Sequence, residues 1–175
     1  MQPYPSHLVQ RLTVKDGTAV TIRPIRPEDA DIEQEFVRNL SGESRYFRFM
    51  DSVRELSPRM LTHFTNVDYD LHMALIAVSE RNGREIELGV ARYIAVEDRQ
   101  DCEFAIVIAD DWQRKGLGAQ LMLALMASAR AAGIRVMHGE VLAGNQRMLQ
   151  FTVKLGFRAR FADHDPRLMR VEIDL

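Results

Sequence analysis

One stretch near the middle of the chain decides the fold, and it reads Asp110-Asp111-Trp112-Gln113-Arg114-Lys115-Gly116-Leu117-Gly118. It separates an apolar run at 102–109, which predicts a strand, from apolar residues that recur every four positions at 117–129, which predict a helix. Backbone N–H groups at a helix N-terminus converge on one point and carry partial positive charge. Gly116 and Gly118 leave room for close approach, and Arg114 and Lys115 add two cations. The stretch therefore predicts a local phosphate-binding loop.

Three other interpretations of this loop fit less well. A Walker loop needs four residues between its first glycine and a Gly-Lys-Ser/Thr ending, and the chain has no such run. A dinucleotide-binding fingerprint would need a third glycine where Leu121 stands, although Glu140 lies near the place of its ribose-binding acid. A solvated loop in which Gly116 only permits a turn is disfavoured by the position between a strand and a helix.

The segments on either side of the loop predict a mixed α/β (α+β) fold. Before the loop, strands at 71–79, 86–96 and 102–109 are joined by the hairpin signal Asn82-Gly83 and by a short polar stretch. Connections this short force antiparallel pairing. After the loop, a strand at 135–142 follows the helix, and a strand-helix-strand order implies that the two strands run parallel.

The remaining elements complete a mostly antiparallel sheet of about six to seven strands flanked by helices. Further strands are predicted at 19–23, 157–162 and 168–174, and further helices at 27–40, 41–50, 57–65 and 145–155. In the helix at 27–40, the acids Asp29, Asp31, Glu33 and Glu35 are interpreted as a solvated face.

Length and composition limit the chain to one domain, which we place at 18–175 after a loose N-terminal lead-in at 1–17. Lys plus Arg (23) and Asp plus Glu (25) nearly cancel to a net charge of -2, so neither nucleic acid nor a membrane is an expected partner. No apolar stretch approaches the ~20 residues of a membrane span. The single cysteine, Cys102, fits a reducing compartment, so a cytoplasmic location is expected. The five histidines show no metal-ligand spacing, and no metal is expected.

Three segments in a fixed order carry a resemblance to a known family. They are Gln113 to Gly118, which matches the pattern Gln/Arg-x-x-Gly-x-Gly/Ala, Ile22 to Ala30, and Asn145 to Phe157. Over roughly residues 18–175 they resemble the acyl-CoA loop, the first strand and helix start, and the late helix of the GNAT superfamily of N-acetyltransferases. The resemblance implies a GNAT-like sheet whose parallel strands splay apart around acetyl-CoA, the co-substrate, and transfer of acetyl to a primary amine by direct attack.

The resemblance also implies which residues bind acetyl-CoA. The loop residues Gln113, Arg114, Lys115, Gly116, Leu117 and Gly118 would hold the pyrophosphate. Backbone groups near Ile106, Val107 and Ile108 would pair with the pantetheine arm. Asn145 resembles an asparagine that contacts CoA, and asparagine is also a favoured helix N-cap, so the residue has two compatible interpretations.

Glu103 is the candidate general base. An amine attacks a thioester in its neutral form, and a lysine amine with a pKa of ~10.4 needs about 4 to 5 kcal/mol to lose its proton at neutral pH. Glu103 shares a predicted strand face with Ala105, Val107 and Ala109, and partial burial there would make it a stronger base. The resemblance places the family's catalytic glutamate on this strand. An exposed acid at the start of a strand is the alternative interpretation.

Within the superfamily, the chain looks most like the catalytic domain of bacterial protein lysine acetyltransferases that modify acyl-CoA synthetases. The segments that carry this likeness are Ser41 to Phe49, Val67 to Asp70, and Glu103 to Ala105 with Asp111 to Gln113. A protein lysine, in an acyl-CoA synthetase or another protein, is therefore the preferred acceptor. Asp68 and Asp70, taken alone, are most simply interpreted as solvated turn residues; if they line the cleft mouth instead, they would attract such an acceptor. A small amine is the alternative acceptor.

Thr152 departs from the family pattern. Many superfamily members have a tyrosine there that protonates the leaving thiolate, so this chain offers no general acid by resemblance. The departure keeps open a non-enzymatic alternative, a catalytically silent acyl-CoA-binding sensor. Homodimer formation is also left open by the sequence.

Overall fold

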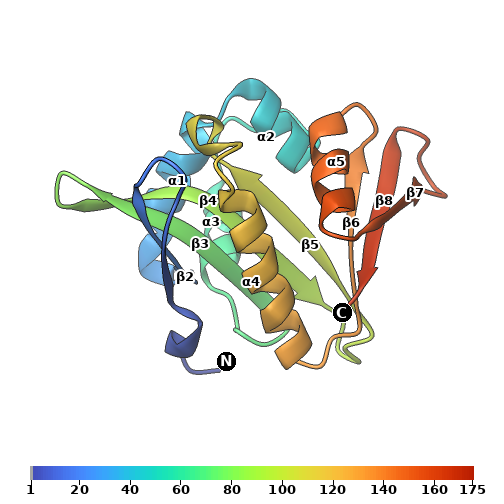
Figure 1. The fold of residues 1–175 in the computed structure, drawn as a ribbon, viewed down its shortest axis with the longest axis horizontal. Helices are drawn as coiled ribbons and strands as arrows, with labels where there is room; N and C mark the ends of the chain where they lie inside the picture. The colour runs from blue at the N-terminus through green and yellow to red at the C-terminus, as the bar shows by residue number, and fades with distance from the viewer. Residues whose placement is uncertain (1) are drawn as a thin grey trace.

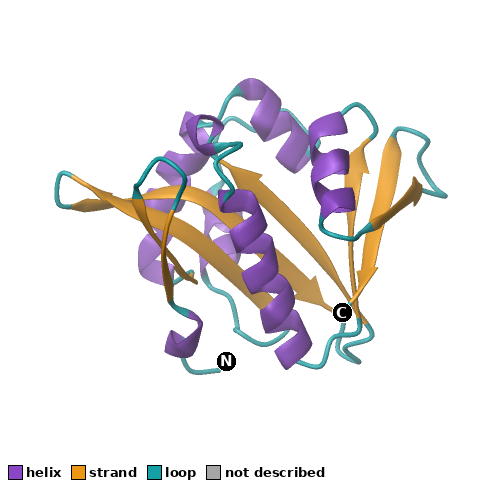
Figure 2. Cartoon of the chain, in the orientation of Figure 1, coloured by secondary structure: helices purple, strands orange, loops and turns teal. Residues whose placement is uncertain are grey.

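The computed structural model describes residues 2–175 and contains one mixed sheet of eight strands (Figure 1, Figure 2). Their order is β1-β2-β3-β4-β5-β6-β8-β7, and every neighbouring pair is antiparallel except β5 and β6. The bounds are β1 (Gln10–Thr13), β2 (Ala19–Pro24), β3 (His72–Arg81), β4 (Arg84–Ala95), β5 (Asp101–Ile108), β6 (Val136–Leu142), β7 (Arg158–Phe161) and β8 (Leu168–Asp174).

Helices cover both faces of this sheet. Helix α4 (Leu117–Ala131) packs on one face, across β3, β4 and β5, while α1 (Ala30–Asn39) and α3 (Pro58–Thr65) cover the other face (Figure 1). Helix α2 (Gly42–Phe49) lies at one end of the sheet, and α5 (Gln146–Lys154) contacts β7. Short 3-10 turns form η1 (Ser6–Leu8), η2 (Pro27–Asp29) and η3 (Asp110–Trp112). Within residues 2–175, none of the helices is long and apolar enough to cross a membrane.

The sheet separates two apolar cores. The core under α4 includes Leu75, Leu121 and Leu125, and the core under α1 and α3 includes Phe36 and Ile76. Each such side chain contributes roughly 1.5–3 kcal/mol when it is removed from water. Cys102 is fully buried in the first core, where burial raises the pKa of its thiol to about 12, so it packs as an inert apolar side chain.

The elements predicted around the phosphate loop are confirmed. The Asn82-Gly83 turn joins β3 to β4 with positive φ at both residues, 52° and 74°, as a two-residue hairpin requires. The crossover through α4 makes β5 and β6 parallel, with Cys102 opposite Met137. The long helix begins immediately after Gly116, at the predicted junction.

The N-terminal lead-in is more ordered than predicted. Residues 10–13 form β1, which pairs with β2 from Gln10 opposite Ile22 to Thr13 opposite Ala19 and adds an eighth strand. Leu8 and Leu12 pack against the core under α4, and Gly17 takes the positive φ of 87° that the connecting turn needs. The prediction missed this strand because four residues with one buried apolar contact show too little alternation to be recognised.

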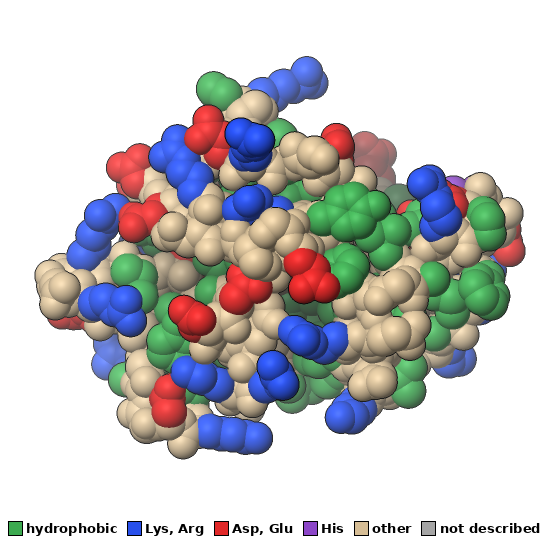
Figure 3. Space-filling view, turned by 90° about the horizontal axis from the view of Figure 1, so that it is seen from above, with side chains coloured by type: hydrophobic (Ala, Val, Ile, Leu, Met, Phe, Trp, Pro, Cys, Tyr) green, Lys and Arg blue, Asp and Glu red, His purple; other side chains and the backbone are tan. Residues whose placement is uncertain are grey.

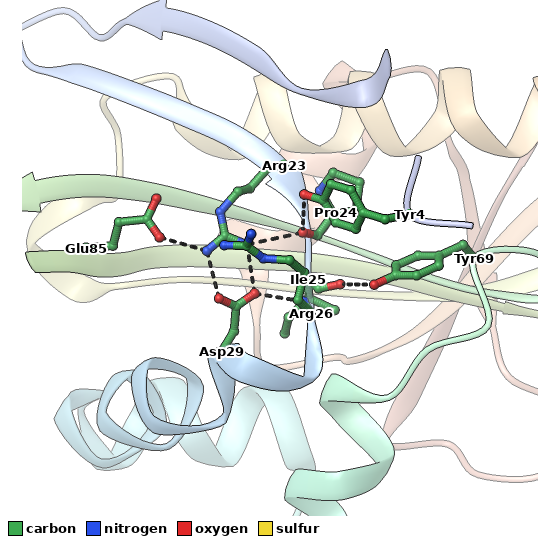
Figure 4. A network of polar contacts seen from close by, with 8 residues as sticks. All are labelled: Tyr4, Arg23, Pro24, Ile25, Arg26, Asp29, Tyr69 and Glu85. Carbon is green, nitrogen blue, oxygen red and sulfur yellow. Dashed lines mark hydrogen bonds and ion pairs between the residues drawn. The ribbon is translucent and has the colours of Figure 1, made fainter. Parts of the chain in front are cut away.

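A buried polar network fixes the passage from β2 to α1 (Figure 4). The Arg23 guanidinium donates to both carboxylate oxygens of Asp29 at 2.7 Å and to Glu85 at 2.8 Å. Asp29 also accepts the backbone N–H of Arg26. Paired in this way, charges that would be costly to bury hold the start of α1 against the sheet. Asp29 is therefore buried and does not belong to the solvated face predicted for this helix.

Candidate active site

A cleft of about 780 Å³ opens between α2 and α5. Its floor is formed by β5 and β6, and one end reaches the loop that precedes α4. Viewed from the end of the molecule that carries α2 and α5, the surface is hollowed beside a group of apolar side chains, with charged side chains around it (Figure 3). The sequence-predicted residues can be placed against this cleft one by one.

The cleft exists because β5 and β6 separate. Their parallel pairing covers only Asp101 to Glu103, and Glu103 lies opposite His138 in the last pair. Beyond that pair the ring of Phe104 occupies the space near β6, 5.2 Å from the ring of Phe157. A Cβ on Gly139 would stand 2.8 Å from the Phe104 ring, so only glycine fits beside it on β6.

The separation leaves one edge of β5 without a strand partner. The N–H of Ala109 donates to Leu88 of β4, so by strand alternation the backbone groups of Phe104, Ile106 and Ile108 point to the cleft. The predicted residues Ile106 and Ile108 therefore present backbone groups there. Val107 lines the cleft too, but its backbone faces β4 and its side chain packs under α1 and α3.

The loop before α4 forms a turn with a defined backbone conformation. Arg114 and Gly116 both adopt left-handed φ, 62° and 86°. The Gln113 side chain ties three elements together, because its Nε2 donates to the Ile108 carbonyl at 3.1 Å and its Oε1 accepts from Arg147 of α5 at 2.8 Å. Arg114, Gly116 and Gly118 line the cleft with Gln113.

Two predicted loop residues do not line the cleft. Lys115 Nζ lies 3.0 Å from Asp16 Oδ2 and 4.5 Å from the centre of the Trp112 ring, which ties the loop to the β1–β2 turn. Leu117 is 1% exposed and belongs to the core under α4. The side chains of both residues support the loop, so any contribution of theirs to phosphate binding would come from the backbone N–H groups.

Asn145 and Thr152 have clear structural roles on α5. The Asn145 side chain accepts the backbone N–H of Met148 at 3.1 Å, so it caps the helix while also lining the cleft. Thr152 is 0% exposed and donates its hydroxyl to the Leu149 carbonyl at 3.0 Å. A buried, engaged hydroxyl of this kind is not available to protonate a leaving group.

Glu103 stands at the inner end of the gap between β5 and β6. Its side chain shares a face with Ile94 of β4 and His138 of β6, the residues opposite it in register. The predicted partial burial is wrong: Glu103 is exposed, and its neighbour Ile94 on the same face is itself 47% exposed. The carboxylate is accessible from the cleft.

Asp68 and Asp70 do not line the cleft, so of their two interpretations the structure favours turn residues over acids that attract an acceptor. Burial alone would raise the pKa of Asp68, but the backbone N–H groups of His72 and Asp70 outweigh it and hold that pKa below its usual value. Asp70 pairs with Arg99 at 2.7 Å. The two acids stabilise the turn into β3.

The sequence analysis missed how α2 is anchored. The carboxylate of Asp110 accepts hydrogen bonds from the Ser41 backbone, the Ser41 hydroxyl and the Ser44 hydroxyl, all within 2.9 Å. Burial of Asp110 opposes ionisation, but these hydrogen bonds outweigh it and lower its pKa. The signal was present in the sequence, since serine at 41 and 44 is typical of a helix start. Its partner lies 66 or more residues away.

A second missed feature is a buried charged cluster beneath α1. Arg92 of β4, 4% exposed, lies 3.4 Å from Glu33 of α1, 2% exposed, and its Nη1 donates to the Phe64 carbonyl. Glu87 is buried beside them without a donor for either carboxylate oxygen within residues 2–175. Burial, reinforced by the neighbouring Glu33 charge, raises the pKa of Glu87 well above its ordinary value. Glu33 was predicted to be solvated, and that prediction is wrong.

Comparison with known proteins assigns this fold and site to a family. A sequence model described as an acetyltransferase (GNAT) domain matches residues 19–158. An acetyltransferase of Pseudomonas aeruginosa is 40% identical over 151 residues, which cover 86% of this chain and 80% of that protein. The chain therefore belongs to the GNAT family of acetyltransferases, enzymes that use acetyl-CoA.

Two further comparisons show which acetyltransferases the chain resembles. The acetyltransferase Pat of Mycolicibacterium smegmatis is 29% identical over 163 residues, 93% of this chain but only 47% of that protein. Among solved structures, the GNAT domain of S. lividans PAT superposes with a TM-score of 0.90 at 28% identity, covering 99% of this chain and 100% of that one. The fold of that domain and of this chain therefore agree over nearly their whole length.

Proposed function

We propose that this acetyltransferase moves the acetyl group of acetyl-CoA to the side-chain amine of a protein lysine by direct attack, with Glu103 accepting the amine proton. The observation that carries the proposal is the position of Glu103. It is the last β5 residue paired with β6, so its carboxylate stands where the strands part and in the same cleft as the phosphate loop.

The cleft offers a matching group for each part of acetyl-CoA. The backbone at Gly116 and Gly118, with the free guanidinium of Arg114, would receive the pyrophosphate at the N-terminus of α4. The unpartnered edge of β5 at Ile106 and Ile108 would pair with the amide groups of the pantetheine arm, much as a further strand would. An extended arm that follows this edge from the loop brings the thioester toward Glu103.

The proton chemistry uses Glu103 as an ordinary, solvent-accessible carboxylate. It accepts the proton of the attacking amine directly or through water, which offsets part of the about 4 to 5 kcal/mol needed to deprotonate a lysine at neutral pH. The exposed side chain can return that proton to solvent without a relay. Thr152 is excluded as a proton donor by its burial, so the CoA thiolate would leave with help from water or a backbone N–H.

Support for a protein lysine comes from the α2 segment and from the shape of the cleft. Ser41 to Phe49, the segment that resembles protein lysine acetyltransferases, forms α2 and builds one wall of the cleft beside Glu103. The likeness to the GNAT domain of S. lividans PAT extends over the same wall. The open side at Glu103 and Ile94 leaves room for a side chain presented by a protein surface.

The experiment compares Glu103→Gln with Glu43→Gln, because Glu43 is a second exposed acid that lines the same cleft from α2. Glu103→Gln should leave acetyl-CoA affinity nearly unchanged and lower turnover by roughly 10²-fold or more at pH 7, with a smaller defect at high pH. Glu43→Gln should retain most of the activity. Equal activity of Glu103→Gln and the unmodified protein at pH 7 would refute the assignment of the base.

The acceptor is tested separately by following CoA release. A purified acyl-CoA synthetase is compared with free polyamines, aminoglycosides and amino acids, and acetylated lysines are identified by mass spectrometry. Turnover on the protein that exceeds turnover on every small amine supports the proposal. Turnover on one free amine that exceeds the protein by orders of magnitude rejects the lysine acceptor and leaves the acetyltransferase assignment intact.

A further inference from the structure

Arg48 is set apart from the other arginines by its surroundings. It lies near the end of α2 and lines the cleft that contains Glu103. Its guanidinium stands 4.9 Å from the centre of the Phe49 ring and 5.7 Å from that of Phe64. The side chain is partly buried, so the charge is held against an aromatic wall and not left to move in bulk water.

No hydrogen bond or ion pair reaches the Arg48 guanidinium from residues 2–175. Eleven of the other arginines in this range donate to a carboxylate, a carbonyl or an amide oxygen, as Arg92 does to Glu33 and Arg147 to Gln113. The arginines that lack such a partner are all exposed, apart from Arg48. A partly buried guanidinium with five donors and no acceptor is an unfinished anion site.

The charged groups around Arg48 do not supply an acceptor for its guanidinium. Burial lowers the pKa of Arg48 to about 10, and repulsion from Arg92, which also stands against the Phe64 ring, acts in the same direction. Glu33, the buried acid of this region, is already paired with Arg92. The side chain is still protonated at neutral pH, so it places on the cleft wall one positive charge that no acid of residues 2–175 pairs with directly.

The position of Arg48 separates it from the proposed phosphate site. Helix α2 is anchored at its first turn to Asp110, beside the phosphate loop, through Ser41 and Ser44. Arg48 lies near the other end of the helix, among Phe64, Arg92 and the field of Glu103. The Arg48 guanidinium is therefore on the acceptor side of the cleft, at the Glu103 end.

We propose that Arg48 forms a carboxylate subsite for the acceptor, so that the enzyme selects lysines with an acidic residue close in sequence or in space. The proposal rests on the protein-lysine function argued above and deepens it. Glu103 receives the amine of the acceptor, and the planar guanidinium of Arg48 receives a carboxylate of the same molecule with two parallel hydrogen bonds. The floor of the cleft then binds the positive charge of the acceptor, and the α2 wall binds its negative charge. A free amino acid would supply the same chemistry through its α-carboxylate, and the test distinguishes the two sources.

The test uses blocked heptapeptides with a central lysine and a single glutamate at each position from three before to three after it, each matched by the same peptide with glutamine. Steady-state kcat/KM is measured for the unmodified protein, Arg48→Gln, Arg48→Lys and the exposed control Arg59→Gln. At the preferred position the unmodified protein should favour glutamate over glutamine by about tenfold, the effect of one charge-assisted hydrogen-bonding contact. Arg48→Gln should remove this preference, Arg48→Lys should retain part of it, and Arg59→Gln should leave it unchanged.

Two measurements separate selectivity from folding and from cofactor binding. Arg48→Gln should keep its acetyl-CoA affinity and its kcat/KM for glutamine peptides within about threefold, because Arg48 is assigned to the carboxylate alone. Loss of acetyl-CoA affinity would overturn the proposal, since the anion would then be a phosphate of CoA. Arg48→Met, which keeps the aliphatic contact with Phe49 and Phe64, repeats the test if Arg48→Gln is unstable.

The remaining outcomes also decide. Equal use of glutamate and glutamine peptides by the unmodified protein overturns the carboxylate subsite while leaving the lysine function standing. A free amino acid used better than its amide, with the difference lost in Arg48→Gln, keeps the subsite and moves its source to a small acceptor. Binding of acetyl-CoA without transfer to any peptide, amino acid or protein refutes the proposed function itself.

Discussion

The two walls of the cleft are stabilised by different kinds of interaction. The wall made by the phosphate loop and α5 uses exposed or half-exposed groups that are close in sequence, such as Gln113, Arg114 and Gly116. The wall made by α2 borders a buried pair from distant segments, Glu33 of α1 with Arg92 of β4, because Arg48 and Arg92 both stand against the Phe64 ring. The first wall depends on backbone conformation and the second on burial and pairing. The two walls should therefore fail in different ways when they are changed.

The largest effect is expected from breaking the buried pair. Arg92→Leu leaves the Glu33 carboxylate buried without its cation, which should lower the free energy of unfolding by about 3–5 kcal/mol. The matched control is Arg38→Leu, because Arg38 pairs with Glu55 at 2.8 Å but both side chains are more than half exposed, and such a pair contributes about 0–1 kcal/mol. Urea unfolding of the unliganded protein measures both. Equal losses in the two variants would contradict the contrast.

The next effect sharpens the description of the loop wall. Gly116→Val places a β-branched residue at φ 86°, so it should lose about 1–3 kcal/mol of stability to backbone strain. It should also lose most of the about 2.7 kcal/mol by which acetyl-CoA at a hundredfold excess over Kd stabilises the folded state. Gly83→Val, at φ 74° in the β3–β4 turn, should show similar strain and keep the cofactor stabilisation. Thermal unfolding with and without acetyl-CoA distinguishes the two, and retained stabilisation in Gly116→Val would count against the loop.

The smallest expected effect is a pH dependence of stability that comes from the buried charged cluster beneath α1. The pKa of Glu87 is raised in the folded protein, so stability is full below the unfolded value of about 4.5 and falls as pH rises toward the folded value. Burial and the Arg92 charge lower the pKa of His72 to about 4, so its contribution is lost as pH falls below about 6.5. Above about 6.5 only the Glu87 effect should remain.

Glu87→Gln provides the corresponding measurement. A glutamine cannot ionise and can still donate to Glu33, so the variant should be more stable than the unmodified protein at pH 8 and closer to it at pH 5. Melting temperatures from pH 5 to 9 give the two curves, and parallel curves would show that Glu87 does not titrate in this range. Each tenfold difference in proton affinity between the folded and unfolded states contributes about 1.4 kcal/mol.

The loop wall could be predicted from the sequence because its information is local. The strand, the glycines at 116 and 118, and the helix follow one another, and the short connections decide which strands are antiparallel. The separation of β5 from β6 was expected only through the resemblance to a family. Its physical cause, the Phe104 ring against Gly139, joins residues that are 35 positions apart and leaves no local pattern.

The buried pair beside the α2 wall could not be predicted from the sequence for a related reason. Glu33 and Arg92 are separated by 59 positions, and each taken alone is most simply interpreted as a solvated charge. The burial of Glu103 was predicted wrongly in the opposite direction. Its apolar strand neighbours suggested a buried side chain, but the face around Ile94 is open to water. Periodicity shows which residues share a face, but whether a helix covers that face is a property of the assembled fold.

The contact between Phe104 and Gly139 constrains how this enzyme can change over evolutionary time. A methyl group at 139 meets the ring at 2.8 Å, so a larger residue there becomes tolerable only after position 104 has become smaller. The order of substitutions matters, because the reverse order passes through a strained intermediate. A larger residue at 139 should therefore occur in homologous chains only together with a smaller residue at 104, whereas glycine at 139 is compatible with either size at 104.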